Sequence, residues 1–316
     1  MPTIAYDARR VALYSPQDDD MIFDDRAEYK VSALAAEFAR LAYVHAEDAQ
    51  PQLDRLRQAL SKVRFGEPKL FDNPDTDTQG FGALREADGL TIVSFRGTEP
   101  AELTDIAVDL VASLTPWNET AGRVHDGFAA ATRSILPAVM QWLDETKNAR
   151  KRLVLTGHSL GAAIATLAAS VCRPDELITF GSPRVGNADF AATLAETAIT
   201  RFVDCCDLVT ELPPELGGYI HAGPMTFIDA DGTLHAARCA RAVVRAGRPR
   251  GGAHRLSSRV CVEEGHRHDQ GSRRPCADKL HPEPHSLISR RAPQRVRTSA
   301  RARSLRLRYR PAHTST

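Results

Sequence analysis

Apolar positions recur every three or four residues in several long segments of the chain. In each of them the apolar side chains fall on one face of a helix and the polar ones on the other. This spacing predicts one or two helices over residues 28–45 and 52–63 and a long helix over 127–147; shorter helices are also expected over 103–110 and, after a cap at Asn187, over 188–197. Helices of this kind need a sheet or another helix on which to bury their apolar face.

Short runs of β-branched and apolar residues alternate with these helices. Residues 78–84 and 90–95 read as a hairpin closed by Asp88-Gly89, and a second hairpin is expected between 224–230 and 233–235. Further strands are predicted over residues 152–156, 176–180 and 199–203. Alternating strands and helices predict an α/β fold whose sheet is largely parallel in the centre and antiparallel at the early hairpin.

The most informative motif is Gly157-His158-Ser159-Leu160-Gly161, which follows the apolar run 152–156 and precedes a small-residue helical segment. A Gly-x-Ser-x-Gly sequence between a strand and a helix is typical of a nucleophile elbow, a sharp turn that exposes the serine hydroxyl. The glycines are needed because a Cβ at either position would meet the neighbouring strand or helix. Ser159 is therefore the candidate nucleophile.

Charge divides the chain into two unlike parts. Residues 236–316 hold 20 Lys and Arg against 5 Asp and Glu, whereas residues 1–235 hold 21 against 35. The second part uses 19 Arg and 1 Lys and shows no helical or strand periodicity. We therefore predict an N-terminal extension over 1–26, a domain over 27–240 and a disordered basic tail over 241–316.

The compartment is predicted from what the sequence lacks. No signal-peptide core is evident in residues 1–25, no run approaches transmembrane length, and the six cysteines have no zinc-ligand spacing. Reduced thiols in the cytoplasm are the expected state, and secretion by another route stays open. The basic tail could bind nucleic acid, but it holds one aromatic residue and no known module, so this partner is not expected.

Five motifs in order resemble the class 3, or fungal-type, lipases of the α/β-hydrolase fold, over roughly residues 30–235. They are Phe95-Arg96-Gly97-Thr98, Val124-His125-Asp126-Gly127-Phe128, Gly157-His158-Ser159-Leu160-Gly161, Phe180-Gly181-Ser182-Pro183-Arg184-Val185-Gly186-Asn187 and Asp207-x-Val209-x-x-Leu212-Pro213-Pro214. The resemblance implies a serine carboxyl-ester hydrolase that acts on acylglycerols or related lipid esters through an acyl-enzyme, with no cofactor and no metal.

Site residues follow from the resemblance by position. It implies that Ser159 is the nucleophile and Asp207 the acid of the triad, while Thr98 and the backbone N–H of Leu160 form the oxyanion hole. The segment Leu114–Trp117 falls where the family keeps its lid, which would touch a lipid surface. For Trp117 itself, an ordinary packed aromatic is an equal alternative. His125, His158 and His221 match structural positions of the family.

After Asp207, none of the histidines lies in a local sequence that resembles the one around the family's triad histidine. His254 lies at a suitable separation and is the candidate base, although its surroundings do not match; His266, His268, His281 and His285 are read as solvated. We hypothesise that the reading frame slips near residues 236–245, because Arg-rich, Lys-poor text is typical of GC-rich DNA read out of frame. The chain as written is then expected to be a poor esterase, and the alternative function is a hydrolase-fold protein without its base.

Overall fold

The computed structural model describes residues 21–98, 113–205, 207–229 and 232–237. These residues all lie in one compact unit. The helix predicted over 103–110, the tail predicted over 241–316 and the candidate base His254 lie outside the described residues.

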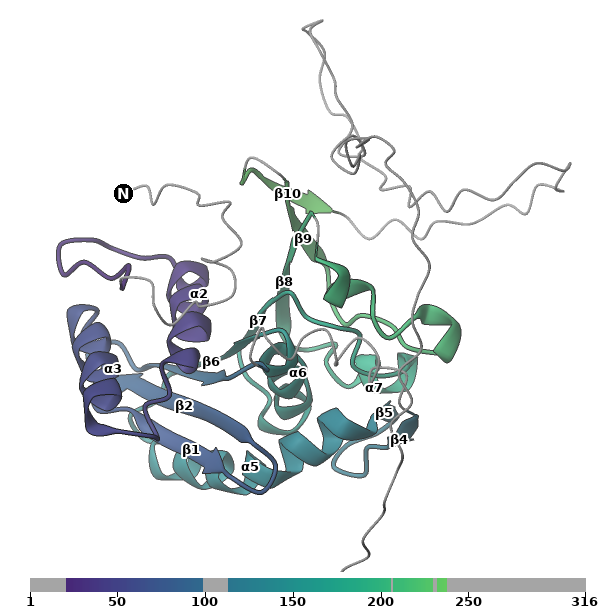
Figure 1. The fold of residues 1–316 in the computed structure, drawn as a ribbon, viewed down its shortest axis with the longest axis horizontal. Helices are drawn as coiled ribbons and strands as arrows, with labels where there is room; N and C mark the ends of the chain where they lie inside the picture. The colour runs from purple at the N-terminus through teal and green to yellow at the C-terminus, as the bar shows by residue number, and fades with distance from the viewer. Residues whose placement is uncertain (1–20, 99–112, 206, 230–231, 238–316) are drawn as a thin grey trace, which may run out of the picture. The chain divides into compact units, whose positions relative to one another are not determined.

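An eight-stranded sheet forms the centre of this unit (Figure 1). Its strand order is β1-β2-β3-β6-β7-β8-β9-β10, parallel from β3 to β9 and antiparallel at both ends. The strands are β1 Lys69–Asn73, β2 Thr78–Arg85, β3 Leu90–Phe95, β6 Arg152–His158, β7 Glu176–Phe180, β8 Ala198–Asp204, β9 Met225–Ile228 and β10 Leu234–Ala237. The predicted α/β class with a mostly parallel central sheet is confirmed.

Helices cover both faces of the sheet, and alternate strand residues point to each face. Val93, Leu155 and Leu177 pack with α5 (Asp126–Glu145) and α6 (Leu160–Cys172) in one apolar cluster. Their neighbours Ile92, Val154 and Ile178 pack in a second cluster with α2 (Val31–Leu41) and α3 (Gln50–Lys62). The short helix α7 (Ala188–Ala192) begins at Asn187, whose side chain accepts a bond from the Phe190 N–H.

Smaller elements complete the described part. A two-stranded sheet joins β4 (Leu114–Pro116) to β5 (Arg123–His125), and 3-10 turns occur at η1 (Ala42–Val44), η3 (Leu208–Glu211) and η4 (Glu215–Gly217). Every parallel strand runs toward the same edge of the sheet, so the segments that follow β3, β6, β7 and β8 meet there. Thr98, Ser159 and Asp207 are on three of these segments.

Candidate active site

Ser159 occupies a strained turn between β6 and α6. Its backbone has φ 56° and ψ −124°, a conformation rare for a residue with a side chain, and the residue is 3% exposed. Its N–H donates to the carbonyl of Phe180 at 3.0 Å. A Cβ at Gly157 would overlap the carbonyl of Gly161, and a Cβ at Gly161 would overlap that of Phe95. Both glycines are therefore required by the close approach of strand and helix, as the sequence predicted.

The pairing of β3 with β6 places Thr98 at the same end of the sheet as Ser159 and Leu160. In the pairing of β3 with β6, Phe95 lies opposite Gly157, so Thr98 follows one strand end and Ser159 the other. Leu160 is the first residue of α6, where backbone N–H groups have no acceptor within the helix. Thr98 is half-buried. These groups therefore share the sheet edge at which Ser159 lies.

Tyr43 packs behind the elbow, and sequence reasoning missed it. Its hydroxyl lies 2.8 Å from Nδ1 of His158, and the residue is 2% exposed. A Cβ at Gly97 would overlap that hydroxyl and lie 2.5 Å from the carbonyl oxygen of His158. Burial lowers the pKa of His158 to about 4, so the ring is neutral at neutral pH. No sequence signal placed residue 43 at this site, because its partner lies 115 positions away in the chain.

Asp207 follows β8 and begins the turn η3. Its Oδ1 accepts a bond from the Val209 N–H at 3.0 Å. A Cβ on Gly181 would lie 2.5 Å from Oδ2 of Asp207 and 3.5 Å from Nε2 of His158, so the carboxylate lies beside the residues that flank the elbow. Burial raises the pKa of Asp207 to about 6; the Val209 N–H opposes this rise and the charge of Asp204 adds to it.

Each of the five histidines in the described ranges contacts a group other than Asp207. His45 contacts Arg96, His125 accepts from the Phe128 N–H, His158 contacts Tyr43, His221 contacts the Thr210 carbonyl and His235 contacts Asp229. No histidine of these ranges forms an ion pair with Asp207. The structural reading of His125, His158 and His221 agrees with these contacts, while His254 lies outside the described residues.

Trp117 is buried rather than exposed at a lid surface. It is 1% exposed, its Nε1–H donates to Oγ of Ser170 at 2.9 Å, and the guanidinium of Arg133 lies 5.0 Å from its ring centroid. Of the two alternatives for this residue, the packed aromatic describes its place. Leu114, at the other end of β4, is half-buried.

One group of potential metal ligands occurs in the described residues, formed by His45, Glu47 and Asp48. The buried guanidinium of Arg96 occupies this group: its Nη1 is 2.6 Å from Nδ1 of His45 and 3.1 Å from Oε1 of Glu47. Arg96 also donates to Asp77 at 3.0 Å. The cluster thus serves as a partner for an arginine that directly precedes Gly97 and Thr98.

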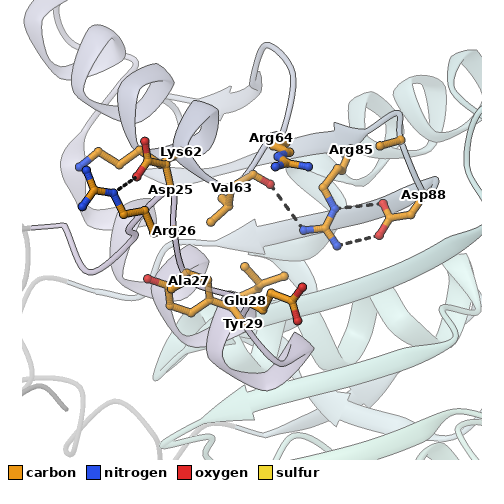
Figure 2. Close-up of a pocket in the computed structure, with 12 residues that line it drawn as sticks. Asp25, Arg26, Ala27, Glu28, Tyr29, Lys62, Val63, Arg64, Arg85 and Asp88 are labelled. Atoms are coloured by element: carbon orange, nitrogen blue, oxygen red, sulfur yellow. Dashed lines mark hydrogen bonds and ion pairs between the residues drawn. The ribbon is translucent and has the colours of Figure 1, made fainter. Parts of the chain in front are cut away.

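A surface hollow of about 510 Å³ lies elsewhere on the unit (Figure 2). It is lined by the segment before α2, the end of α3 and the β2–β3 turn, where Arg85 pairs with Asp88. That turn is at the opposite end of β3 from Thr98. The hollow is therefore separate from the edge that holds Ser159, and its mixed charges do not suit an acyl chain.

Comparison with known proteins agrees with this geometry. Residues 92–217 match the family described as Lipase (class 3). The chain is 40% identical over 114 residues to a secreted mono- and diacylglycerol lipase 1 of Fusarium solani, covering 34% of each chain. It is 31% identical over 177 residues to secreted mono- and diacylglycerol lipase A of Penicillium cyclopium, covering 50% of this chain and 54% of that one.

Comparison of the fold with solved structures also indicates similarity to lipases. The crystal structure of a lipase from Rhizopus microsporus var. chinensis superposes with a TM-score of 0.50 at 25% identity, covering 71% of this chain and 76% of that one. The predicted resemblance to class 3 lipases and the α/β-hydrolase fold are confirmed. The chain spans 34% and 54% of the length of the two curated relatives.

The predicted cytoplasmic location is wrong. The two relatives are both described as secreted lipases, and this finding contradicts a cytoplasmic location. The prediction rested on missing sequence signals, and an absent signal is weak evidence about a compartment. Within the described ranges, none of the helices has the length and apolar character needed to cross a bilayer.

Proposed function

We propose that this protein is a serine carboxyl-ester hydrolase that acts on acylglycerols. The observation that carries the proposal is the strained, buried Ser159 at the sheet edge that it shares with Thr98 and Asp207. A serine in this conformation presents its hydroxyl at the end of a strand, where a substrate can approach. The match of residues 92–217 to a lipase family supports the same conclusion.

The proposed reaction proceeds through an acyl-enzyme. Oγ of Ser159 attacks the ester carbonyl carbon, and a histidine takes the hydroxyl proton and passes it to the departing alcohol as the C–O bond breaks. Water then hydrolyses the acyl-enzyme by the same route. The hydroxyl and backbone N–H of Thr98 and the N–H of Leu160 stabilise the oxyanion. Asp207 orients the histidine, and His254 is the candidate for that base.

The substrate class rests on the relatives and on exposed apolar side chains. Both curated relatives are mono- and diacylglycerol lipases by name. Leu208 is 78% exposed directly after Asp207, and Leu216 is fully exposed on η4 of the same loop. Exposed leucines around a site suit contact with a lipid surface. We propose that these leucines, together with the half-buried Leu114, make the lipid contact first predicted for Leu114–Trp117.

A second candidate is a hydrolase-fold protein that lacks its base. The observation in its favour is that every described histidine contacts a group other than Asp207. A triad without its base loses several orders of magnitude in rate. The proposed frame slip near residues 236–245, close to the proposed domain boundary near residue 240, would remove the triad histidine from the chain. The nucleotide sequence of codons 230–255 tests the slip.

Hydrolysis of a p-nitrophenyl ester and of a monoacylglycerol, with matched variants, separates the two candidates. Turnover that disappears in Ser159→Ala and His254→Ala, but not in His266→Ala, supports the hydrolase with His254 as base. Turnover in Ser159→Ala at more than a few per cent of the parent rate contradicts the serine mechanism, because losing the nucleophile costs about six orders of magnitude. A folded protein with no turnover, rescued when the shifted frame is restored, supports the second candidate.

A further inference from the structure

Four consecutive carbonyl oxygens after Asp207 accept hydrogen bonds from outside their loop. Nη1 of Arg184 donates to the carbonyls of Glu211 and Pro213, and the backbone N–H of Arg184 donates to that of Leu212 at 2.7 Å. The carbonyl of Thr210 lies 2.9 Å from Nε2 of His221. A surface loop normally leaves most of its carbonyls to water.

Arg184 is built into this arrangement. It follows β7, is 7% exposed, and its Nη2 donates to the carboxylates of Glu211 at 3.4 Å and Glu215 at 3.2 Å. Both carboxylates are exposed, with side chains 74% and 75% accessible, so the ion pairs themselves contribute little. The buried bonds to the backbone carbonyls hold the loop more firmly, since a buried guanidinium without acceptors is costly.

His221 completes the arrangement from the segment before β9. Because a carbonyl oxygen only accepts hydrogen bonds, the ring must carry its proton on Nε2. Burial, together with the positive charges of Arg201 and Arg184, lowers the pKa of His221 to about 3 although the bond to the Thr210 carbonyl opposes this fall, so the ring stays neutral. A neutral ring bonded to Thr210 is a fixed donor, which makes it unsuited to be the base for Ser159.

We propose that Arg184 and His221 are positioning residues that clamp residues 210–213 and thereby fix the carboxylate of Asp207. The inference rests on the proposed role of Asp207 as the triad acid. A few hydrogen bonds connect the clamped residues to Asp207. Its Oδ1 accepts from the Val209 N–H, its carbonyl accepts from Oγ1 of Thr210 at 2.8 Å, and Leu212 N–H donates back to the Val209 carbonyl at 3.1 Å. Movement of the clamped carbonyls would therefore move the carboxylate.

The clamp is tested by titrating the Asp207 carboxyl in the full chain by carbon-13 NMR, with the resonance identified by its loss in Asp207→Asn. The groups that face the carboxylate are Asp204, the Val209 N–H and the ring of His158. A loosened loop lets water reach the carboxylate. In Arg184→Met and His221→Phe the pKa is then expected to fall by about one unit or more, toward its ordinary value. Amide exchange across residues 208–212 is expected to quicken about tenfold.

A conservative variant keeps the test informative if Arg184→Met and His221→Phe unfold. Arg184→Lys retains one donor near Nη1 and is expected to fall between the parent and Arg184→Met. Arg133→Met is the matched control, since Arg133 bonds Glu119 and the Pro116 carbonyl in another part of the unit. Parental Asp207 pKa and parental exchange in folded Arg184→Lys, or in either of the other two variants when it folds, would overturn the clamp. Neither readout needs turnover, so failure of the proposed hydrolase activity is recognised separately.

Discussion

The hydroxyl of Tyr43 lies 2.8 Å from Nδ1 of His158, the residue that directly precedes Ser159. This bond joins the turn after α2 to the elbow, and the same hydroxyl also lies against Gly97. Tyr43 thus supports both the proposed nucleophile and the segment that leads to Thr98. A residue more than a hundred positions away in the chain therefore holds the back of the proposed site.

Tyr43→Phe tests this support. The change keeps the ring and removes the bond, leaving a buried imidazole nitrogen without its partner. We expect the free energy of unfolding to fall by about 1–3 kcal/mol and the reactivity of Ser159 toward a phosphonate ester to fall with it. Tyr29→Phe is the control, because the Tyr29 hydroxyl bonds the Ile22 carbonyl in the segment before α2. Equal loss of Ser159 reactivity in both variants would count against a specific role for Tyr43.

Thr98 is predicted to act on the transition state. Thr98→Ala removes the hydroxyl donor from the proposed oxyanion hole, so kcat for an ester substrate is expected to fall by about 10² to 10³ with little change in KM. Thr98→Ser keeps the hydroxyl and is expected to be much milder. Steady-state kinetics of the two variants make the measurement. An effect confined to KM would show that Thr98 only binds the substrate.

Asp207 gives a prediction about stability and pH. Its pKa is about 6 in the folded protein because the carboxyl is buried, and about 3.9 when unfolded, so the folded state binds this proton more tightly. Through this group the free energy of unfolding falls as the pH rises from about 4 to about 6, and then levels off. Asp207→Asn removes the ionisation. Its stability relative to the parent is therefore expected to rise across that interval and to stay constant above it.

Urea unfolding at several pH values between 4 and 8 measures this difference. Asp144→Asn is the control, since the Asp144 side chain is 73% exposed and pairs with Lys147. A stability difference between Asp207→Asn and the parent that does not change with pH would show that Asp207 is hydrated in the folded protein.

Trp117 is expected to contribute to stability and not to lipid contact. Trp117→Phe removes the indole N–H and leaves the Ser170 hydroxyl without its buried donor. The melting temperature should fall, while the fraction of protein that sediments with neutral lipid vesicles should not change. Leu208→Ser, at an exposed position, should leave the melting temperature unchanged and lower the fraction that sediments with the vesicles. Reduced vesicle binding by folded Trp117→Phe would restore the lid interpretation.

Much of the central sheet was predictable because its strands carry strong local signals. The run 176–180 is the same in sequence and structure, and the elbow was recognised from two glycines whose roles depend only on neighbouring backbone. Lys69–Asn73 was missed as β1, since the strand holds two apolar residues and gains its stability from pairing with β2. The helix predicted over 188–197 ends at Ala192, where the next turns tighten so that Ala198 can enter β8.

The supports of the candidate site were not predictable in the same way. Tyr43, Arg96 and Arg184 act through partners distant in the sequence, and no local spacing shows which buried polar group will meet which carbonyl. Trp117 is the opposite case, a residue whose segment the sequence placed at the site and that the structure buries elsewhere. Its segment suggested a lid, while its contact with Ser170 on α6 depends on how two remote elements pack.

Labelling with an alkyl phosphonate ester, followed by peptide mass spectrometry, tests most directly whether Ser159 is an activated nucleophile. The folded protein is expected to carry one adduct, on the peptide that contains Ser159, and to carry none as Ser159→Ala or after denaturation. The reagent needs an activated serine and a formed oxyanion hole, but no turnover. A folded protein that acquires no adduct, or one modified at another serine, would contradict the account.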